Sequence, residues 1–228
     1  MCGRARLAMD YAEIKIQLRL SDLAPAPNLR PSRNIAPTQD LLIVIHGAEG
    51  RMPQLARWGL IPSWAKDSKL KLSTFNARAE TVAAAHTFRG AWRAGRRCLV
   101  VTDGFYEWRR SDRQPFLVVD SRGRLTILAG LWEVWRSPTG EQVRSCTILT
   151  TAADALMAPL HDRMPVVLAE ADWPVWLGEV DAPAERLAAL MAPGPSDALA
   201  MRPVDRRVGN PRYDDPSLDA VAVSYKSG

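Results

Sequence analysis

The stretch from Cys98 to Trp108 reads CLVVTDGFYEW and joins an apolar run to an aromatic one. The branched residues from Cys98 to Val101 predict a buried strand. This strand ends in a polar turn, after which Glu107 stands between two large aromatic side chains. A carboxylate enclosed by rings is partly removed from water, which raises its pKa and suits it to proton transfer near neutral pH. The alternative is that Glu107 points outward from a strand whose aromatic side chains face the core.

Further strands and short helices are predicted on both sides of this stretch. Apolar runs predict strands at 41–45, 55–60, 115–119, 125–131, 143–150 and 200–203, with a possible strand at 220–224. Apolar spacing predicts helices at 10–20, 87–93, 153–158, 173–177 and 185–191. The prolines between residues 25 and 37 exclude regular helix there. Because no repeat and no linker divides the chain, we expect one domain over residues 1–228.

The composition is that of a folded protein in a reducing compartment. The chain has 228 residues, 47% of them hydrophobic, but no run of about twenty apolar residues that would predict a membrane span. No signal-peptide pattern opens the sequence, so we expect a cytoplasmic protein. The three cysteines, Cys2, Cys98 and Cys146, are too widely spaced for a zinc site and odd in number, which favours free thiols. We therefore expect neither a metal nor a cofactor.

The charge of the chain points weakly to a polyanionic partner. The net charge is +5, and twenty-five of the thirty basic residues are arginine. Arginine binds phosphate through a bidentate fork and stacks on bases, so this bias favours nucleic acid. A genome-wide codon bias towards arginine explains the same composition equally well.

A loop rich in tryptophan offers a surface on which bases could stack. Trp58 and Trp64 flank a glycine and a proline in the sequence WGLIPSWAK, which predicts a turn rather than a strand. Aromatic side chains exposed beside lysines stack on the bases of single-stranded nucleic acid. The alternative is an ordinary corner of the core with both tryptophans buried.

Two polar segments carry further candidate site residues. In FNARAET, Asn76 could hydrogen-bond a reacting group and Arg78 could bind a phosphate. The alternative is structural, with Asn76 as a helix cap and Glu80 paired with Arg78. In LHDRMPV, His161 lies in a polar turn where it could move protons, or simply form hydrogen bonds within the turn.

The start of the chain, Met1-Cys2-Gly3-Arg4, carries a distinctive nucleophile if the initiator methionine is removed. Cys2 would then hold an α-amine, whose ordinary pKa is about 7.7–8.0, next to a thiol. An aldehyde condenses with the amine to an imine, and the thiol closes a five-membered thiazolidine at high effective concentration. An internal cysteine cannot react in this way because its nitrogen belongs to an amide. Taken alone, Cys2 could equally be an ordinary residue near a start codon.

Five ordered segments together resemble one known family. The segments are Met1-Cys2-Gly3-Arg4, Asn34-Ile35-Ala36-Pro37-Thr38, Asn76-Ala77-Arg78-Ala79-Glu80-Thr81, Gly104-Phe105-Tyr106-Glu107-Trp108 and His161-Asp162-Arg163-Met164-Pro165. In this set the chain is similar to the SRAP family (SOS response-associated peptidase), now described as abasic-site processing proteins. WGLIP at 58–62 and VGNP at 208–211 are weaker matches, and the segments together span nearly the whole chain.

The resemblance implies a fold, an activity and a set of site residues. It implies a single α+β domain of curved, mostly antiparallel, barrel-like sheets flanked by short helices. It also implies a monomer that binds single-stranded DNA and covalently captures abasic sites in the response to DNA damage. Carried over, the catalytic residues are Cys2 as nucleophile, Asn76 as positioning group, Glu107 as proton shuttle and His161 as a proton donor to the sugar oxygen. The expected DNA contacts are Arg4, Pro37, Trp58, Trp64, Arg78 and Arg163.

Two departures from the family pattern and two other functions stay open. Arg33 stands where an aromatic commonly occurs, and Gly209-Asn210 replaces a frequent pair of asparagines. One alternative is a cysteine peptidase with Cys2 as nucleophile, His161 as base and Glu107 as its orienting group. The other is a module that binds single strands without a covalent step.

Overall fold

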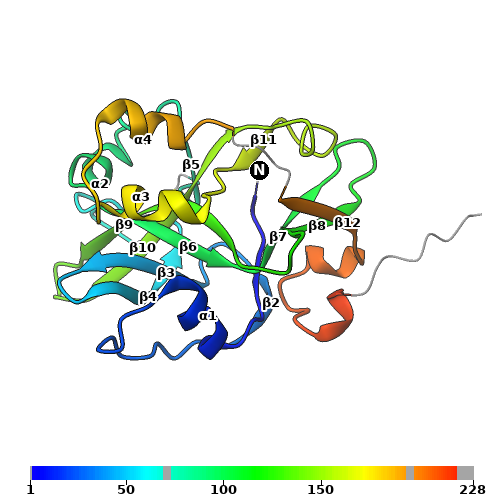
Figure 1. Ribbon diagram of the computed structural model, residues 1–228, viewed down its shortest axis with the longest axis horizontal. Coiled ribbons are helices and arrows are strands. Elements are labelled where there is room, and N and C mark those ends of the chain that lie inside the picture. The colour runs from blue at the N-terminus through cyan, green and yellow to red at the C-terminus, as the bar shows by residue number, and fades with distance from the viewer. Residues whose placement is uncertain (1, 69–72, 194–197, 220–228) are drawn as a thin grey trace, which may run out of the picture.

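The computed structural model describes residues 2–68, 73–193 and 198–219, which form two sheets and several short helices (Figure 1). The strands are β1 (Ala5–Leu7), β2 (Ser32–Ile35), β3 (Asp40–Gly47), β4 (Gly50–Trp58), β5 (Asn76–Arg78), β6 (Arg97–Thr102), β7 (Gly104–Trp108), β8 (Pro115–Asp120), β9 (Thr126–Arg136), β10 (Gln142–Ala152), β11 (Arg163–Pro165) and β12 (Leu199–Pro203). The helices are α1 (Tyr11–Leu18), α2 (Arg89–Arg93), α3 (Trp173–Leu177) and α4 (Ala184–Leu190), with 3₁₀ turns η1 (Glu170–Asp172), η2 (Arg206–Gly209) and η3 (Pro216–Asp219). This is the expected α+β architecture.

The larger sheet closes on itself as a barrel. Its order is β11-β10-β4-β3-β6-β9, and β9 pairs in turn with β10, so the path from β10 returns to β10. β5 pairs with β10 in parallel, and β11 pairs with β10 in antiparallel. At Gly130 in β9 a Cβ atom would lie 2.7 Å from the Val100 side chain, so only glycine lets the barrel wall approach this closely.

The smaller sheet has the order β12-β8-β7-β1-β2. The stretch from Cys98 to Trp108 links the two sheets, because β6 belongs to the barrel and β7 to the smaller sheet. Asp103 in the turn between them accepts hydrogen bonds from the backbone N–H groups of Ala8 and Met9. The turn therefore holds the chain that leaves β1. In Figure 1 the N-terminal segment, in blue, runs up the middle of the molecule with the barrel on its left and β7, β8 and β12 on its right.

The helices are short and cover the outside of the sheets. Asp10 caps α1 by accepting a hydrogen bond from the N–H of Ala12 at 2.8 Å. α3 packs on β6, where the indole Nε1 of Trp176 donates to the carbonyl of Cys98 at 3.0 Å. The tryptophan is fully buried, so this bond satisfies its one donor and fixes the helix on the barrel.

Most elements predicted from the sequence are confirmed, with boundaries shifted by a few residues. The exceptions are local. Residues 153–158 form hydrogen-bonded turns rather than a helix, because Asp154 accepts from the N–H of Met157 and so caps a single turn. The strands β1, β2, β5, β7 and β11 were not predicted, and the possible strand at 220–224 lies outside the described residues. Within the described residues, no helix is long and apolar enough to cross a membrane.

Candidate active site at the amino terminus

The pairing of β1 with β7 carries Cys2 into the interior between the two sheets. Ala5 lies opposite Phe105, and the N–H of Tyr106 donates to the carbonyl of Arg4 at 2.9 Å. Continuing this antiparallel register places the start of the chain beside Glu107 near the end of β7. The Cys2 side chain is fully buried. Burial, together with the nearby charge of Glu107, raises the pKa of its thiol to about 12, so the thiol is protonated at neutral pH.

Asn76 at the start of β5 holds the backbone of Cys2. β5 runs parallel to β10, with Asn76 opposite Ile148, and this pairing fixes where the side chain projects. Its Nδ2 donates to the carbonyl oxygen of Cys2 at 2.7 Å. Its Oδ1 is buried and has no hydrogen-bond partner in the described part of the chain. The helix-cap alternative for Asn76 is therefore wrong, since the residue begins a strand and contacts Cys2.

Glu107 is a buried carboxylate, so the outward-facing alternative is also wrong. Only 3% of the residue is exposed. Burial raises its pKa, and a hydrogen bond from the N–H of Trp108 at 3.3 Å opposes the rise without cancelling it. A carboxyl group of this kind can hold or release a proton closer to neutral pH than an exposed glutamate can.

His161 lies in the turn before β11, and its ring orientation is fixed. Its Nδ1 is 3.0 Å from the N–H of Arg163 and 2.7 Å from a carboxylate oxygen of Asp162. One nitrogen cannot accept the first contact and donate the second at once. Burial lowers the pKa of His161, which favours the neutral ring. The contacts with Asp162 and with Nη2 of Arg110, which lies 3.5 Å from Nε2, favour the proton on Nδ1, whereas the N–H of Arg163 favours Nδ1 as acceptor.

These four predicted catalytic residues form one linked group. Asn76 contacts Cys2 directly, and the charge of Glu107 raises the pKa of the Cys2 thiol. The guanidinium of Arg110 lies 3.5 Å from Nε2 of His161; its charge contributes to the lowered pKa of His161 and opposes the rise in the pKa of Glu107. The group combines a thiol with two proton carriers whose pKa values move towards each other.

Arg4 is engaged within the protein, in a contact that sequence reasoning did not assign. Its Nη1 donates to the side-chain oxygen of Asn34 at 2.9 Å and to the carbonyl of Val208 at 2.8 Å, and its Nη2 to the carbonyl of Gly209 at 3.2 Å. Asn34 in turn donates to the carbonyls of Asn210 and Tyr213 at 3.0 and 2.6 Å. We call this cluster the latch. It accounts for the NIAPT and VGNP segments as structural partners, while contact of Arg4 with DNA stays a prediction.

The two other predicted arginines differ in their surroundings. Arg78 is exposed at the end of β5. Arg163 is 15% exposed and binds both carboxylate oxygens of Glu80. The alternative in which Glu80 pairs with Arg78 is therefore corrected: the bidentate partner of Glu80 is Arg163, which lies far away in sequence.

The two predicted stacking tryptophans also differ. Trp58 is the last residue of β4, is fully buried and donates from Nε1 to the carbonyl of Phe75 at 2.8 Å. The prediction that Trp58 lies on a turn and stacks on DNA is wrong, because its indole is a packed core side chain. Trp64 is 54% exposed, with its ring 4.4 Å from that of His86. Pro37, half-buried, lines a cavity of about 230 Å³ that ends at Trp58 and Phe75.

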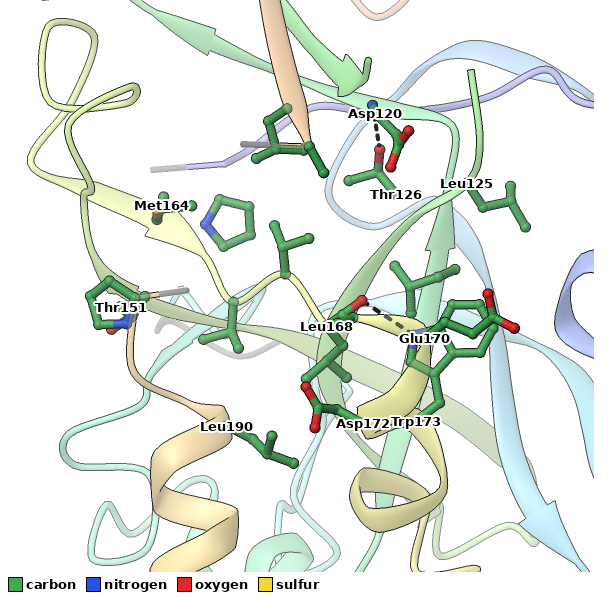
Figure 2. Close-up of a pocket in the computed structure, with 18 of the residues that line it drawn as sticks. Asp120, Leu125, Thr126, Thr151, Met164, Leu168, Glu170, Asp172, Trp173 and Leu190 are labelled. Carbon is green, nitrogen blue, oxygen red and sulfur yellow. Dashed lines mark hydrogen bonds between the residues drawn. The ribbon is translucent and has the colours of Figure 1, made fainter. Parts of the chain in front are cut away.

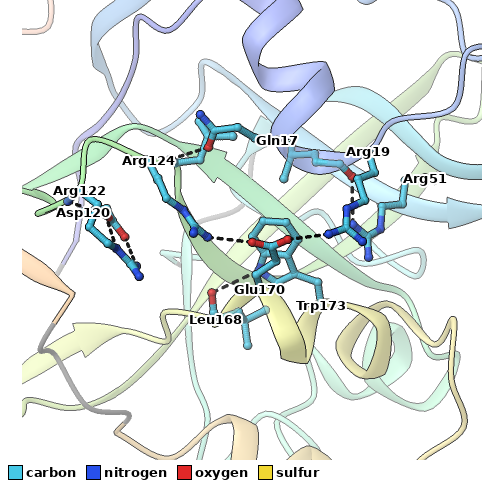
Figure 3. A network of polar contacts seen from close by, with 11 residues as sticks. Gln17, Arg19, Arg51, Asp120, Arg122, Arg124, Leu168, Glu170 and Trp173 are labelled. Atoms are coloured by element: carbon cyan, nitrogen blue, oxygen red, sulfur yellow. Dashed lines mark hydrogen bonds and ion pairs between the residues drawn. The ribbon is translucent and has the colours of Figure 1, made fainter.

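A second cavity, of about 380 Å³, is lined by other residues. Figure 2 shows its apolar walls, which include Leu168, Trp173 and Leu190. Figure 3 shows Glu170 beside it, accepting hydrogen bonds from Arg19 and Arg124 at 3.1 and 2.9 Å. None of the predicted site residues is among the described residues that line this cavity. In the described ranges, no cluster of histidine, cysteine, aspartate or glutamate is arranged to hold a metal ion.

Comparison with known proteins identifies the family. The model of the family described as SOS response associated peptidase (SRAP) matches residues 1–211. The abasic site processing protein YoqW of Bacillus subtilis (strain 168) is 36% identical over 222 residues, covering 96% of this chain and 98% of that protein. The abasic site processing protein HMCES of Xenopus tropicalis is 30% identical over an alignment of 273 residues, covering 100% of this chain and 81% of that protein.

The fold has been seen before in a crystal structure of a protein from Bacteroides thetaiotaomicron. The two structures superpose with a TM-score of 0.84 at 21% identity, covering 97% of this chain and 100% of the other. At this identity the likeness bears on the fold alone. The match of the family model over most of the chain, together with these relatives, confirms the resemblance seen in the sequence: the chain belongs to the SRAP family.

Proposed function

We propose that this protein captures abasic sites in single-stranded DNA through a thiazolidine formed by Cys2. The observation that carries the proposal is the contact of Asn76 with the backbone of Cys2 beside the buried carboxyl of Glu107. The names of its relatives support abasic-site processing as the general activity. The reactive partner would be the aldehyde of the ring-opened abasic sugar.

The reaction needs a free amine on Cys2, so Met1, which lies outside the described residues, would first be removed. The amine adds to the sugar aldehyde, and loss of water gives an imine. The thiol sulfur then bonds to the imine carbon while its proton passes to the nitrogen, which closes the ring with no other reagent consumed. Glu107 would carry protons in the addition and dehydration, and His161 would help to protonate the sugar oxygen as the sugar ring opens.

The surroundings of the thiol favour ring closure over peptidase chemistry. A cysteine peptidase attacks as a thiolate, usually formed by an adjacent histidine. Here burial raises the pKa of the Cys2 thiol to about 12, the opposite of an activated nucleophile. In thiazolidine formation the thiol attacks the imine carbon bonded to the nitrogen of the same residue. The closeness of the two groups compensates for a thiol that is not ionised. The peptidase alternative requires a thiolate that this burial disfavours.

The DNA would lie across the surface next to this group. Arg78 and Trp64 are the predicted contacts that are exposed, and they offer a phosphate partner and a stacking surface. The net charge of +5 favours binding to the phosphate backbone. We propose that the protein acts as a monomer, in the cytoplasm, on damaged DNA.

The direct test is a denaturing gel after incubation with a single-stranded oligonucleotide that contains one abasic site. We expect the wild type to give a heat-stable shifted band and Cys2→Ala to give none, because the variant has no sulfur to close the ring. Cys98→Ala is the matched control, since Cys98 is also fully buried but lies in β6. A heat-stable band from Cys2→Ala equal to that of the wild type would refute the thiazolidine.

The peptidase alternative is separated by a short extension fused before Met1. A peptidase would release the extension in the wild type and fail to do so in Cys2→Ala and Glu107→Gln. Thiazolidine chemistry predicts that the extended protein, with no free amine on Cys2, gives no crosslink at all. Intact-mass measurement reads out both results.

A further inference from the structure

Glu80 occupies both terminal nitrogens of Arg163, which would otherwise form the two parallel hydrogen bonds to a DNA phosphate. The two terminal nitrogens of Arg163 donate to the two carboxylate oxygens of Glu80 at 2.5 and 2.9 Å. Nη2 also donates to the carbonyl and hydroxyl oxygens of Thr150. The remaining donor, Nε, is buried. The fork formed by Nη1 and Nη2 is therefore occupied by Glu80, and Nε is enclosed.

The position and charge of Glu80 allow another anion to replace its carboxylate on Arg163. Its side chain is 49% exposed, whereas that of Arg163 is 15% exposed, so the carboxylate forms the outer half of the pair. The hydrogen bond from Arg163 lowers the pKa of Glu80, and the charge of Arg78 contributes to the same shift. Two parallel N–H···O bonds to a carboxylate have the same geometry as those to a phosphate.

We propose that Glu80 is a specificity-determining residue that occupies the fork of Arg163 until a DNA phosphate displaces it. This inference rests on the proposed binding of single-stranded DNA. A lone phosphate competes poorly with a carboxylate tethered nearby. A strand already held at the exposed Arg78 presents its next phosphate at high effective concentration and competes well. Glu80 thus disfavours strands that contact Arg163 alone, whereas strands that contact both arginines still bind.

The pair of Glu80 and Arg163 is also connected to His161, the predicted proton donor. The backbone N–H of Arg163 fixes the ring of His161 through Nδ1. The pair also ties β11, which begins at Arg163, to the segment that follows β5. Glu80 is therefore displaced from the same residue whose backbone N–H contacts His161.

The test is a double-mutant cycle on binding of a fluorescent single-stranded oligonucleotide without any abasic site, so that only the non-covalent step is measured. The proteins are the wild type, Glu80→Gln, Arg163→Gln and the double variant. We expect Glu80→Gln to bind about tenfold more tightly at low salt, because the freed fork gains one charge-assisted contact. Its slope of log affinity against log salt should steepen by about 0.7, the value for one phosphate on a single strand. Arg163→Gln should weaken binding by removing the phosphate contact, and the double variant should bind no more tightly than Arg163→Gln alone.

The controls separate this inference from the proposed function. Arg78→Gln should weaken binding in both the wild-type and the Glu80→Gln backgrounds. Glu80→Asp, whose shorter carboxylate reaches the fork less well, should fall between wild type and Glu80→Gln and serves if the glutamine variant fails to fold. Unchanged or weaker binding by Glu80→Gln, in a protein that still crosslinks abasic DNA through Cys2, overturns the role of Glu80 alone. Absence of all binding and crosslinking removes the proposed function and this inference together.

Discussion

Glu107 is a charged residue whose surroundings favour its neutral form. It is 3% exposed, and burial raises its pKa more than the opposing contacts lower it. Such a carboxyl is less stable in the folded protein when ionised than in water, and it exchanges protons closer to neutral pH. The raised pKa of Glu107 should therefore affect both the pH dependence of the reaction and the stability of the protein.

In the reaction, Glu107→Gln keeps the shape of the side chain but cannot exchange a proton. We expect crosslink formation on abasic DNA to slow by about a hundredfold, within the usual contribution of one acid–base group. The wild-type rate should also show a pH-dependent limb above the ordinary range of a glutamate, and this limb should vanish in the variant. Rates from quenched time points between about pH 5 and pH 8 test both. Equal rates with an unchanged pH profile would remove Glu107 from the mechanism.

Glu107→Gln should also stabilise the folded protein at high pH. Because the folded pKa of Glu107 is raised, the folded protein binds more protons than the unfolded chain between the two pKa values. The contribution of Glu107 is thus most favourable below its unfolded pKa and is lost as pH rises through its folded pKa. Glu107→Gln should therefore melt at a higher temperature than the wild type near pH 8, with the difference shrinking near pH 4. A variant that melts lower at pH 8 would contradict this sign.

At this scale, the sequence predicted which residues belong to the candidate site but not how they pair. Cys2, Asn76 and Glu107 were identified from the ordered set of segments, because each segment taken alone is a weak signal. The partner of Glu80 could not be found in this way, because Arg78 is two positions away and Arg163 is brought near only by the pairing of β5 and β11 with β10. Local proximity therefore suggested the wrong arginine.

At the scale of elements, the latch determines where β1 lies. β1 has three residues, too few to be held by its ladder alone, and Arg4 beside it binds Asn34 and the carbonyls of η2. Asn34 is 1% exposed, so each of its hydrogen bonds replaces a lost contact with water. The position of Cys2 thus depends on a segment about two hundred residues away in sequence.

Asn34→Ala should destabilise the protein by about 3 kcal/mol, because it removes three hydrogen bonds, one from Arg4 and two to the carbonyls of Asn210 and Tyr213. Urea unfolding followed by fluorescence measures this directly. Asn210→Ala is the matched control, since only the backbone carbonyl of Asn210 receives the hydrogen bond from Asn34. Equal losses in the two variants would mean that the latch does not depend on the Asn34 side chain.

Elements with a strong local pattern were predicted, and those made by distant partners were not. β3 and β6 are long apolar runs, and both were found. β2 was missed because it lies after a proline-rich stretch and is a strand only through its pairing with β1. Trp58 was placed on a turn because of the Gly59 that follows, whereas the strand continues up to it and the barrel buries it.

At the scale of the whole molecule, the barrel and the smaller sheet share one site. Cys2 extends from β1 of the smaller sheet, and Asn76 comes from β5 on the barrel. The link between the two sheets through β6 and β7 is direct, with one residue between the strands. The sheets should therefore unfold together.

We predict a single cooperative transition in urea for the wild type. Tryptophan fluorescence, far-UV circular dichroism and residual crosslinking to abasic DNA should give the same midpoint, because loss of either sheet removes one side of the site. The expected single domain over residues 1–228 is tested by the same experiment. Separate midpoints for fluorescence and crosslinking would indicate two units that unfold independently.

The latch also sets an order of events during synthesis. Cys2 is enclosed, and the strand that follows it is secured by residues 208–213, which leave the ribosome about two hundred residues later. The proposed reaction needs Met1 to be removed, and the open chain that exists before residues 208–213 have been made gives an aminopeptidase time for that cleavage.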